Sequence, residues 1–145
     1  MDFMTAIDIG ASGLKAERTL LNVISMNLAN VNTTETAEGG TYRRKMVNFE
    51  AVPTESPFSR AMQGALDREL KGVKVSGVVD DPRPFRKVYE PGHPNADEEG
   101  YVNYPNVNVV QEMANMMTAM RSYEASVTSI STAKGMFEKA LELGR

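Results

Sequence analysis

The chain has 145 residues, of which 41% are hydrophobic and 24% are charged, a composition typical of one folded domain rather than of a disordered chain. The absence of cysteine excludes disulfides and thiol chemistry, and the net charge of −3 argues against nucleic acid as a main partner. No apolar run approaches the ~20 residues that cross a bilayer, and the N-terminal stretch MDFMTAIDIG lacks the positive charge of a cleaved secretory signal. We therefore expect a protein that is not membrane-embedded.

The N-terminal part of the chain, residues 1–34, predicts an amphipathic helix. From Phe3 to Val31, positions at alternating spacings of three and four residues are apolar in seven of nine cases, which is the pattern of a heptad seam. Such a seam packs against another helix, so this helix is expected to have a helical partner.

Asparagines crowd the end of this helix, in the stretch SMNLANVNTTE over residues 25–35. Asparagine is a poor helix former because its side chain competes for backbone hydrogen bonds. Two explanations remain open. Either Asn30 or Asn32 ends the helix in a left-handed cap conformation, or the amides of Asn27 and Asn30 flank the seam and fix its register against neighbouring helices.

The middle of the chain, residues 35–105, predicts a small β-rich domain. All seven prolines lie between residues 53 and 105, so helices are confined to the two ends. Residues 53–70 carry a weak pattern and predict a mobile loop. Alternating apolar residues or flanking turn residues predict strands over 46–52, 72–79, 85–90 and 101–104.

Three polar features of this middle region have simple structural interpretations. His93 is the only histidine, and the PGHPN stretch around it predicts a turn rather than a metal or catalytic site. The run Asp97–Glu99 predicts a solvated loop tip. The basic cluster YRRK (residues 42–45) favours a strand with one solvated face over a nucleic-acid contact. No catalytic, cofactor-binding or metal site is predicted, so an enzyme is not expected.

The C-terminal part of the chain, residues 106–145, predicts a second helix, with a heptad seam from Val109 to Leu141 and Gly144 at its expected end. The stretch EMANMMTAM (112–120) carries a stripe of four methionines, which is wider than a two-helix seam requires. Core packing within the chain is one explanation. We favour a surface that packs on several neighbouring chains, because methionine adapts to irregular partners.

Together these elements predict an α+β fold in which long N- and C-terminal helices pair as a coiled-coil-like arm around a small β-rich middle domain. Helices of 30 to 35 residues are roughly 45 to 50 Å long, which exceeds the diameter of a compact domain of this size. The arms are therefore expected to project from a globular body, to pair with each other, or to pack on other chains. The residues expected at such subunit contacts are Ile7, Leu14, Leu21, Ile24, Asn27, Leu28, Asn30, Val31, Met113, Met116, Met117, Met120, Tyr123, Val127, Ile130, Phe137 and Leu141.

Three stretches of the sequence resemble the bacterial flagellar rod and hook axial proteins. SMNLANVNTTETAEGGTYRRKMVNF (25–49) resembles the N-terminal signature of that family, although Thr41 is inserted into its Gly-Tyr turn. VYEPGHPNADEEGYVNYPNVNVVQEMANMMTAMRSYEAS (88–126) is similar to the proximal rod members in particular, and MFEKALELGR at the end agrees with them. At Ser126 the relatives often carry asparagine instead.

The resemblance implies a structural subunit of the proximal rod of the flagellar basal body, with no cofactor. Its terminal helices (1–34 and 106–145) would form the inner tube of a hollow periplasmic drive-shaft that transmits torque, with residues 35–105 outside. The implied partners are further copies and other proximal rod subunits, the distal rod, the adaptor between membrane ring and rod, and the flagellar type III apparatus, which exports such subunits without a cleaved signal. The alternative is a non-flagellar coiled-coil adaptor or a type III-secreted interaction protein.

Overall fold

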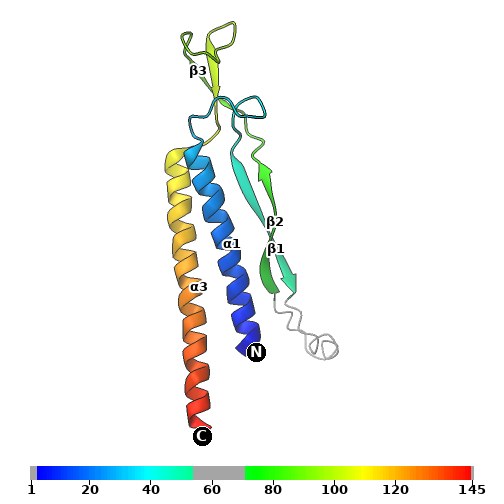
Figure 1. Cartoon of the computed structure of the whole chain (residues 1–145), viewed down its shortest axis with the longest axis vertical. Coiled ribbons are helices and arrows are strands. Elements are labelled where there is room, and N and C mark those ends of the chain that lie inside the picture. Colours follow the sequence, from blue (N-terminus) through cyan, green and yellow to red (C-terminus); the bar gives the residue numbers. More distant parts are fainter. Residues whose placement is uncertain (1–2, 54–70, 145) are drawn as a thin grey trace.

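The computed structural model describes residues 3–53 and 71–144, so most of the mobile loop predicted at 53–70 lies outside the described residues. Two long helices run side by side along the molecule, and two β-hairpins lie beside and beyond them (Figure 1). This arrangement confirms the predicted α+β fold with helical ends. The elements in chain order are α1 (Phe3–Ala29), β1 (Lys45–Pro53), β2 (Lys71–Asp80), β3 (Arg86–Tyr89), β4 (Tyr101–Tyr104) and α3 (Val109–Leu143).

The two helices are antiparallel and keep one register along their length. Ile130 packs over Gly10 near the start of α1, where a Cβ on the glycine would lie 2.7 Å from the isoleucine side chain. At the other end of the pair, Asn27 of α1 bonds to Glu112 in the first turn of α3. Glycine at position 10 thus lets the two backbones approach closely while a β-branched side chain fills the space between them.

The contact stripe of α3 includes Ile130 of the predicted seam but is shifted by one residue at alternate seam positions. Ala119 is 2% exposed, whereas the neighbouring seam residues Met120 and Val127 are 49% and 44% exposed. Ser126 faces Gly13 of α1 at ordinary contact distance. Small side chains therefore form the contact between the helices, because they allow a close approach, and much of the larger apolar surface of α3 stays outside it.

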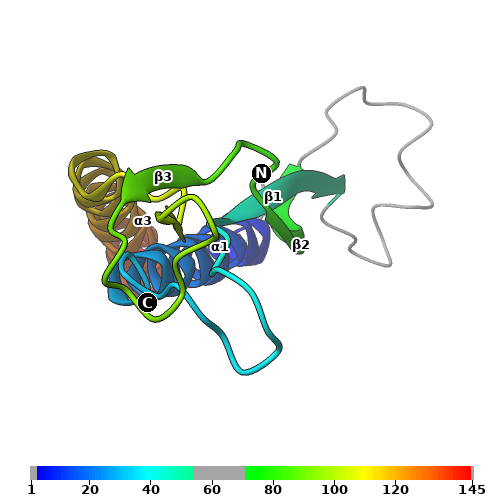
Figure 2. The same cartoon turned by 90° about the horizontal axis from the view of Figure 1, so that it is seen from above.

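Helix α1 is covered on two sides, since it lies between α3 and the β1–β2 hairpin (Figure 2). Its buried apolar residues are Ala16, Val23 and Ile24. The hydroxyl of Ser12 accepts a hydrogen bond from the backbone N–H of Val73 in β2 at 3.1 Å. An outward-pointing N–H group of this edge strand is thereby satisfied by the helix.

The strands form two separate antiparallel hairpins rather than one sheet. β1 and β2 pair from Lys45 opposite Asp80 to Pro53 opposite Lys71, with a bulge where Asn48 and Phe49 meet their partners. β3 and β4 form the short hairpin at the end of the molecule where α3 begins (Figure 1). All four strands were predicted within one residue of their bounds.

The short hairpin is closed by an aromatic pair. The rings of Tyr89 and Tyr101 meet edge to face, with centroids 5.3 Å apart. Gly100 precedes Tyr101 with a φ of +83°, and a Cβ there would lie 2.9 Å from the Tyr89 ring. Glycine is therefore required both by the left-handed backbone and by the ring.

Candidate functional site

Asn27 is the centre of a buried polar junction where α1 ends. Its side chain is 1% exposed. The amide nitrogen donates to the carbonyl oxygen of Lys45 at 2.9 Å and to Glu112 Oε2 at 3.2 Å. The amide oxygen accepts from the Tyr42 hydroxyl at 3.0 Å and from the Lys45 backbone N–H at 2.9 Å. Both donors and both lone pairs of the amide are satisfied, as burial of such a group requires.

Arg44, the residue before β1, extends the junction to α3. Its Nε and Nη2 atoms donate to Glu112 Oε1 at 2.8 and 2.6 Å, while Nη1 reaches Asp81 Oδ2 at 3.2 Å. Glu112 is 1% exposed, although it stands in the first turn of α3. A carboxylate at a helix N-terminus is favoured by the helix dipole, and here the charge of Arg44 also neutralises it.

Asp81 forms the outer side of the junction, directly after β2. It is 2% exposed and accepts hydrogen bonds from Arg83 as well as from Arg44. The hydrogen bonds from Arg83 hold the pKa of Asp81 well below the usual carboxyl range, against the opposing effect of its burial. Asp81 therefore stays ionised between two guanidinium groups.

Two asparagines fix the start of α3 on this junction. Asn106 accepts a hydrogen bond from the Arg44 backbone N–H at 3.0 Å and donates to the carbonyl oxygen of Arg83 at 3.2 Å. Asn108 is the N-cap of α3, and its side chain accepts from the Gln111 backbone N–H at 3.1 Å. We call the connected set the polar junction: Asn27, Tyr42, Arg44, Asp81, Arg83, Asn106 and Glu112.

The junction corrects two interpretations made from the sequence. No described residue other than glycine has a positive φ, so neither Asn30 nor Asn32 is a left-handed cap. Instead, the Asn30 side chain donates to the Met26 carbonyl oxygen at 2.8 Å and accepts from the Thr33 hydroxyl. The YRRK cluster is not a strand with one solvated face either, because the strand begins only at Lys45 and the Arg44 side chain is 15% exposed.

The immediate surroundings of the junction affect two further groups. Burial raises the pKa of Tyr42, whose hydroxyl acts as a donor to Asn27. A hydrogen bond to Asp80 raises the pKa of Lys45, although this pair lies at the surface. Both groups therefore keep their ordinary neutral-pH protonation states.

A groove of about 350 Å³ adjoins the junction between α1, β1 and α3. Its lining includes the apolar side chains of Ile24, Met46 and Ala119. Glu17 also lines it, and its Oε2 atom is shielded from solvent yet accepts no hydrogen bond from the described residues. Burial raises the pKa of Glu17. This carboxylate oxygen therefore lacks a hydrogen-bond donor among the described residues.

The subunit-contact residues expected from the sequence divide into two groups. Ile24 and Asn27 are 2% and 1% exposed inside the single chain, so they have little surface left for a neighbour in this conformation. In contrast, Met113 and Met117 are 56% and 58% exposed. Contacts between subunits stay a prediction for the whole set. Partly covered members are Ile7, Leu14, Leu21, Leu28, Asn30, Val31, Met116, Tyr123 and Ile130, and further exposed ones are Met120, Val127, Phe137 and Leu141.

The remaining polar features have the structural roles expected of them. Nδ1 of His93 accepts a hydrogen bond from the Asn95 backbone N–H at 3.1 Å, which confirms the turn. The residues Asp97–Glu99 are exposed, and Asp97 accepts from the backbone N–H of Tyr101. Within residues 3–53 and 71–144, no three histidine, aspartate or glutamate side chains gather in an arrangement suited to a metal ion. No helix in these ranges is long and apolar enough to cross a membrane.

Two family models match the helical ends of the chain. Residues 7–35 match the family model for the flagella basal body rod protein, and residues 98–143 match that for the C-terminal part of the flagellar basal body rod FlgEFG proteins. These two ranges contain Asn27 and Glu112 respectively.

Several relatives that match over nearly their whole length are described as flagellar basal-body rod protein FlgC. The Salmonella typhimurium protein is 40% identical over 145 residues, which cover 100% of both chains. The Bacillus subtilis protein is 39% identical and covers 97% of each chain. The Aquifex aeolicus protein is 38% identical, with coverage of 98% of this chain and 97% of its own.

Proposed function

The chain belongs to the flagellar basal-body rod protein family and is a structural subunit of the proximal rod, and from this premise we propose how it builds the rod. We propose that α1 and α3 of each copy pack against the helices of neighbouring rod subunits to form a hollow shaft. In this arrangement the helical parts, residues 1–34 and 106–145, line the inner tube, and residues 35–105 lie outside it.

The open apolar face of α3 is the observation that carries this proposal. Met113, Met117 and Met120 are about half exposed in the single chain, and Val110 is 77% exposed. A face of this length and apolar character is an adhesive surface on a lone molecule. Its burial between subunits removes that surface from water, and methionine adapts to neighbours that are not equivalent around the shaft.

The polar junction supplies the stiffness that a shaft requires. A purely apolar seam between helices can slip by a heptad at modest cost. Sliding α3 along α1 would separate Glu112 from Asn27 and Arg44, and it would leave buried charges without partners. The junction therefore holds one helix–helix register within each subunit, so that torque applied to one subunit passes on to the next.

The location at the flagellar basal body and assembly with other rod components follow from the family. The finer assignments belong to our proposal: a periplasmic position, contacts with the distal rod and with the adaptor at the membrane ring, and export by the flagellar type III apparatus without a cleaved signal peptide. The alternative of a non-flagellar adaptor or secreted interaction protein has no support among the relatives, which are rod proteins over their whole length.

Deletion of the gene tests the proposal most directly. Cells without this chain should keep the membrane ring of the basal body, lack a rod, and be non-motile. Electron microscopy of purified basal bodies distinguishes these states. A complete rod in the deletion strain contradicts the proposed function, and complementation with the intact gene is the control for secondary effects.

A further inference from the structure

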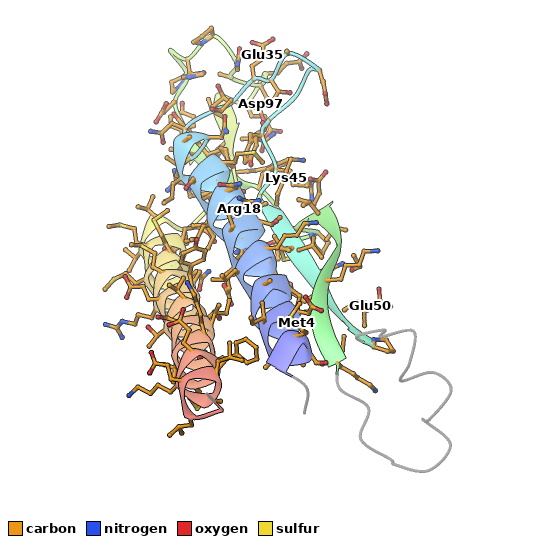
Figure 3. All side chains as sticks on the ribbon, turned by 60° about the horizontal axis from the view of Figure 1, so that its bottom comes forward. Met4, Arg18, Glu35, Lys45, Glu50 and Asp97 are labelled. Atoms are coloured by element: carbon orange, nitrogen blue, oxygen red, sulfur yellow. The ribbon has the colours of Figure 1, made fainter. Side chains whose placement is uncertain are left out.

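Helix α1 presents two different surfaces on its opposite sides. With 3.6 residues per turn, positions 11, 15, 18, 22, 25 and 29 share one side of the helix, and all six are exposed. Arg18 lies on this side about halfway along α1 (Figure 3). It makes no ion pair with any described residue. The groove that contains Glu17 lies on the other side of the helix, between α3 and β1.

The groove is suited to a side chain with an apolar stem and a cationic end. Leu20, Ile24 and Met46 supply apolar walls that match the methylene groups of arginine or lysine. Glu17 Oε2 is shielded from solvent and has no hydrogen-bond donor among the described residues. A buried carboxylate oxygen without a donor is costly, so a donor from outside the chain would lower the free energy of the site.

The axial positions of Glu17 and Arg18 on α1 indicate which residue of a neighbouring copy could supply this donor. Glu17 and Arg18 are consecutive, so their axial positions on α1 differ by only about 1.5 Å. When copies stand side by side at the same level, Arg18 on the back of one copy is level with Glu17 in the groove of the next. Such a contact is heterologous, and repeated rotation of heterologous contacts closes a ring or continues as a helix.

We propose that the Arg18 guanidinium of one copy enters the groove of an adjacent copy and pairs there with Glu17. This inference rests on the proposed function, because it requires subunits packed side by side. The Arg18–Glu17 pair would fix the orientation of one subunit on the next. The apolar face of α3 does not specify that orientation. Arginine suits this contact because its planar guanidinium offers several donors to one carboxylate.

A charge swap tests the pairing in cells that carry the chain as their only copy. Arg18→Glu and Glu17→Arg should each lower the yield of basal bodies with rods by at least about tenfold, since each variant places an unpaired or repelled charge at a buried contact. The double variant that carries both changes restores complementary charges between copies, and it should recover most of the yield. Lys87→Glu is the matched control, because Lys87 is an exposed basic residue of β3, which does not contact α1, and it should change the yield less than twofold.

Site-specific cross-linking provides a second measurement, made possible by the absence of cysteine in the chain. Glu17→Cys and Arg18→Cys are placed on separate copies that are expressed together, and a bifunctional maleimide reagent joins them, because an Arg–Glu pair holds the two Cα atoms farther apart than a disulfide spans. Treated basal bodies that contain both variants should give dimers on a denaturing gel. Each single cysteine variant should give none.

The outcomes separate this inference from the proposed function. Normal rod assembly with Arg18→Glu would overturn the Arg18–Glu17 contact. So would a double charge swap that fails to recover the yield while each purified variant keeps its helix content by circular dichroism. Both outcomes leave the rod assignment intact. Rods that contain both cysteines but show no cross-linked product also overturn the contact. A wild-type chain that never enters the basal body would instead overturn the proposed function itself.

Discussion

The two ends of the helical pair are stabilised by different kinds of interaction. Where α1 ends and α3 begins, buried charges and amides meet, and Glu112 is 1% exposed. Toward the other end, α3 makes contact through small side chains, and Met136 and Leu143 are 64% and 89% exposed. The polar contacts at the first end are complete within the single chain, yet Val110 and Met113 beside them leave apolar surface exposed, as Met136 and Leu143 do at the other end. The difference indicates that contacts within the subunit and surface available for assembly lie on different faces of α3.

The largest expected effect comes from breaking the polar junction. Arg44→Ala leaves the Glu112 carboxylate buried without its cation, so the free energy of unfolding should fall by about 3–5 kcal/mol. Chemical denaturation of the purified chain, followed by circular dichroism, measures the change. The control is Lys45→Ala, which removes the exposed ion pair with Asp80 and should cost about 1 kcal/mol or less. Equal losses for the two variants would contradict a special role for the junction.

Acidification should weaken the same end of the molecule. The folded pKa of Asp81 lies below the unfolded value of about 4, so its contribution is complete above that unfolded value and is lost as the pH falls toward the folded pKa. Denaturation midpoints measured from pH 7 down to pH 2 should decrease on the acid side. In Asp81→Asn this acid-dependent decrease should be smaller, while stability at pH 7 is lower. A decrease of the same size in both proteins would show that other carboxyl groups control it.

A larger side chain at the contact between the helices should lower the free energy of unfolding by an intermediate amount. Gly10→Ala places a Cβ 2.7 Å from the Ile130 side chain, and overpacking of this kind costs about 1–3 kcal/mol. Gly13→Ala is the matched control on the same helix, because its Cβ would lie 3.8 Å from Ser126 and the better helix propensity of alanine should dominate. Thermal unfolding distinguishes the two variants. Equal stability of Gly10→Ala and Gly13→Ala would contradict the close contact between the two helices at Gly10 and Ile130.

The smallest effect on the stability of the isolated chain should come from a substitution on the exposed apolar face of α3. Met117 is 58% exposed, so Met117→Asp should change the free energy of unfolding by only about 0.5 kcal/mol. Rod assembly in cells should nevertheless be impaired, because the same position would be buried between subunits. Lys87→Asp, at an exposed position of β3 outside both helices, is the control. Normal motility with Met117→Asp would exclude this part of α3 from the assembly surface.

The sequence predicted the elements of the fold well because each one carries a local signal. Heptad spacing marked both helices, and alternating valines together with proline and glycine marked the strands. The methionine stripe was also correctly predicted to exceed what a two-helix contact needs, since Met113 and Met117 remain largely exposed. These features depend only on neighbours along the chain, so periodicity is sufficient to find them.

The polar junction could not be predicted from the same signals. Asn27 was placed beside the seam and considered as a contact to neighbouring subunits, but it bonds to Lys45 and Glu112 of its own chain. Arg44 was grouped with its basic neighbours, and Glu112 showed no distinguishing pattern. Hydrogen-bonded partners of this kind are up to 85 residues apart in the chain, and no single sequence indicates which distant polar residues will meet.

The amino-acid sequence by itself determined that this protein has two long amphipathic helices around short strands, because backbone propensity and apolar spacing act over a few residues. Tertiary structure alone decided which side of α3 faces α1 and which remains open. That choice depends on the close approach permitted at Gly10 and on the buried charges of Arg44 and Glu112, which are satisfied in only one register. Small and polar residues thus set the geometry of the subunit, and the larger apolar residues remain available for assembly.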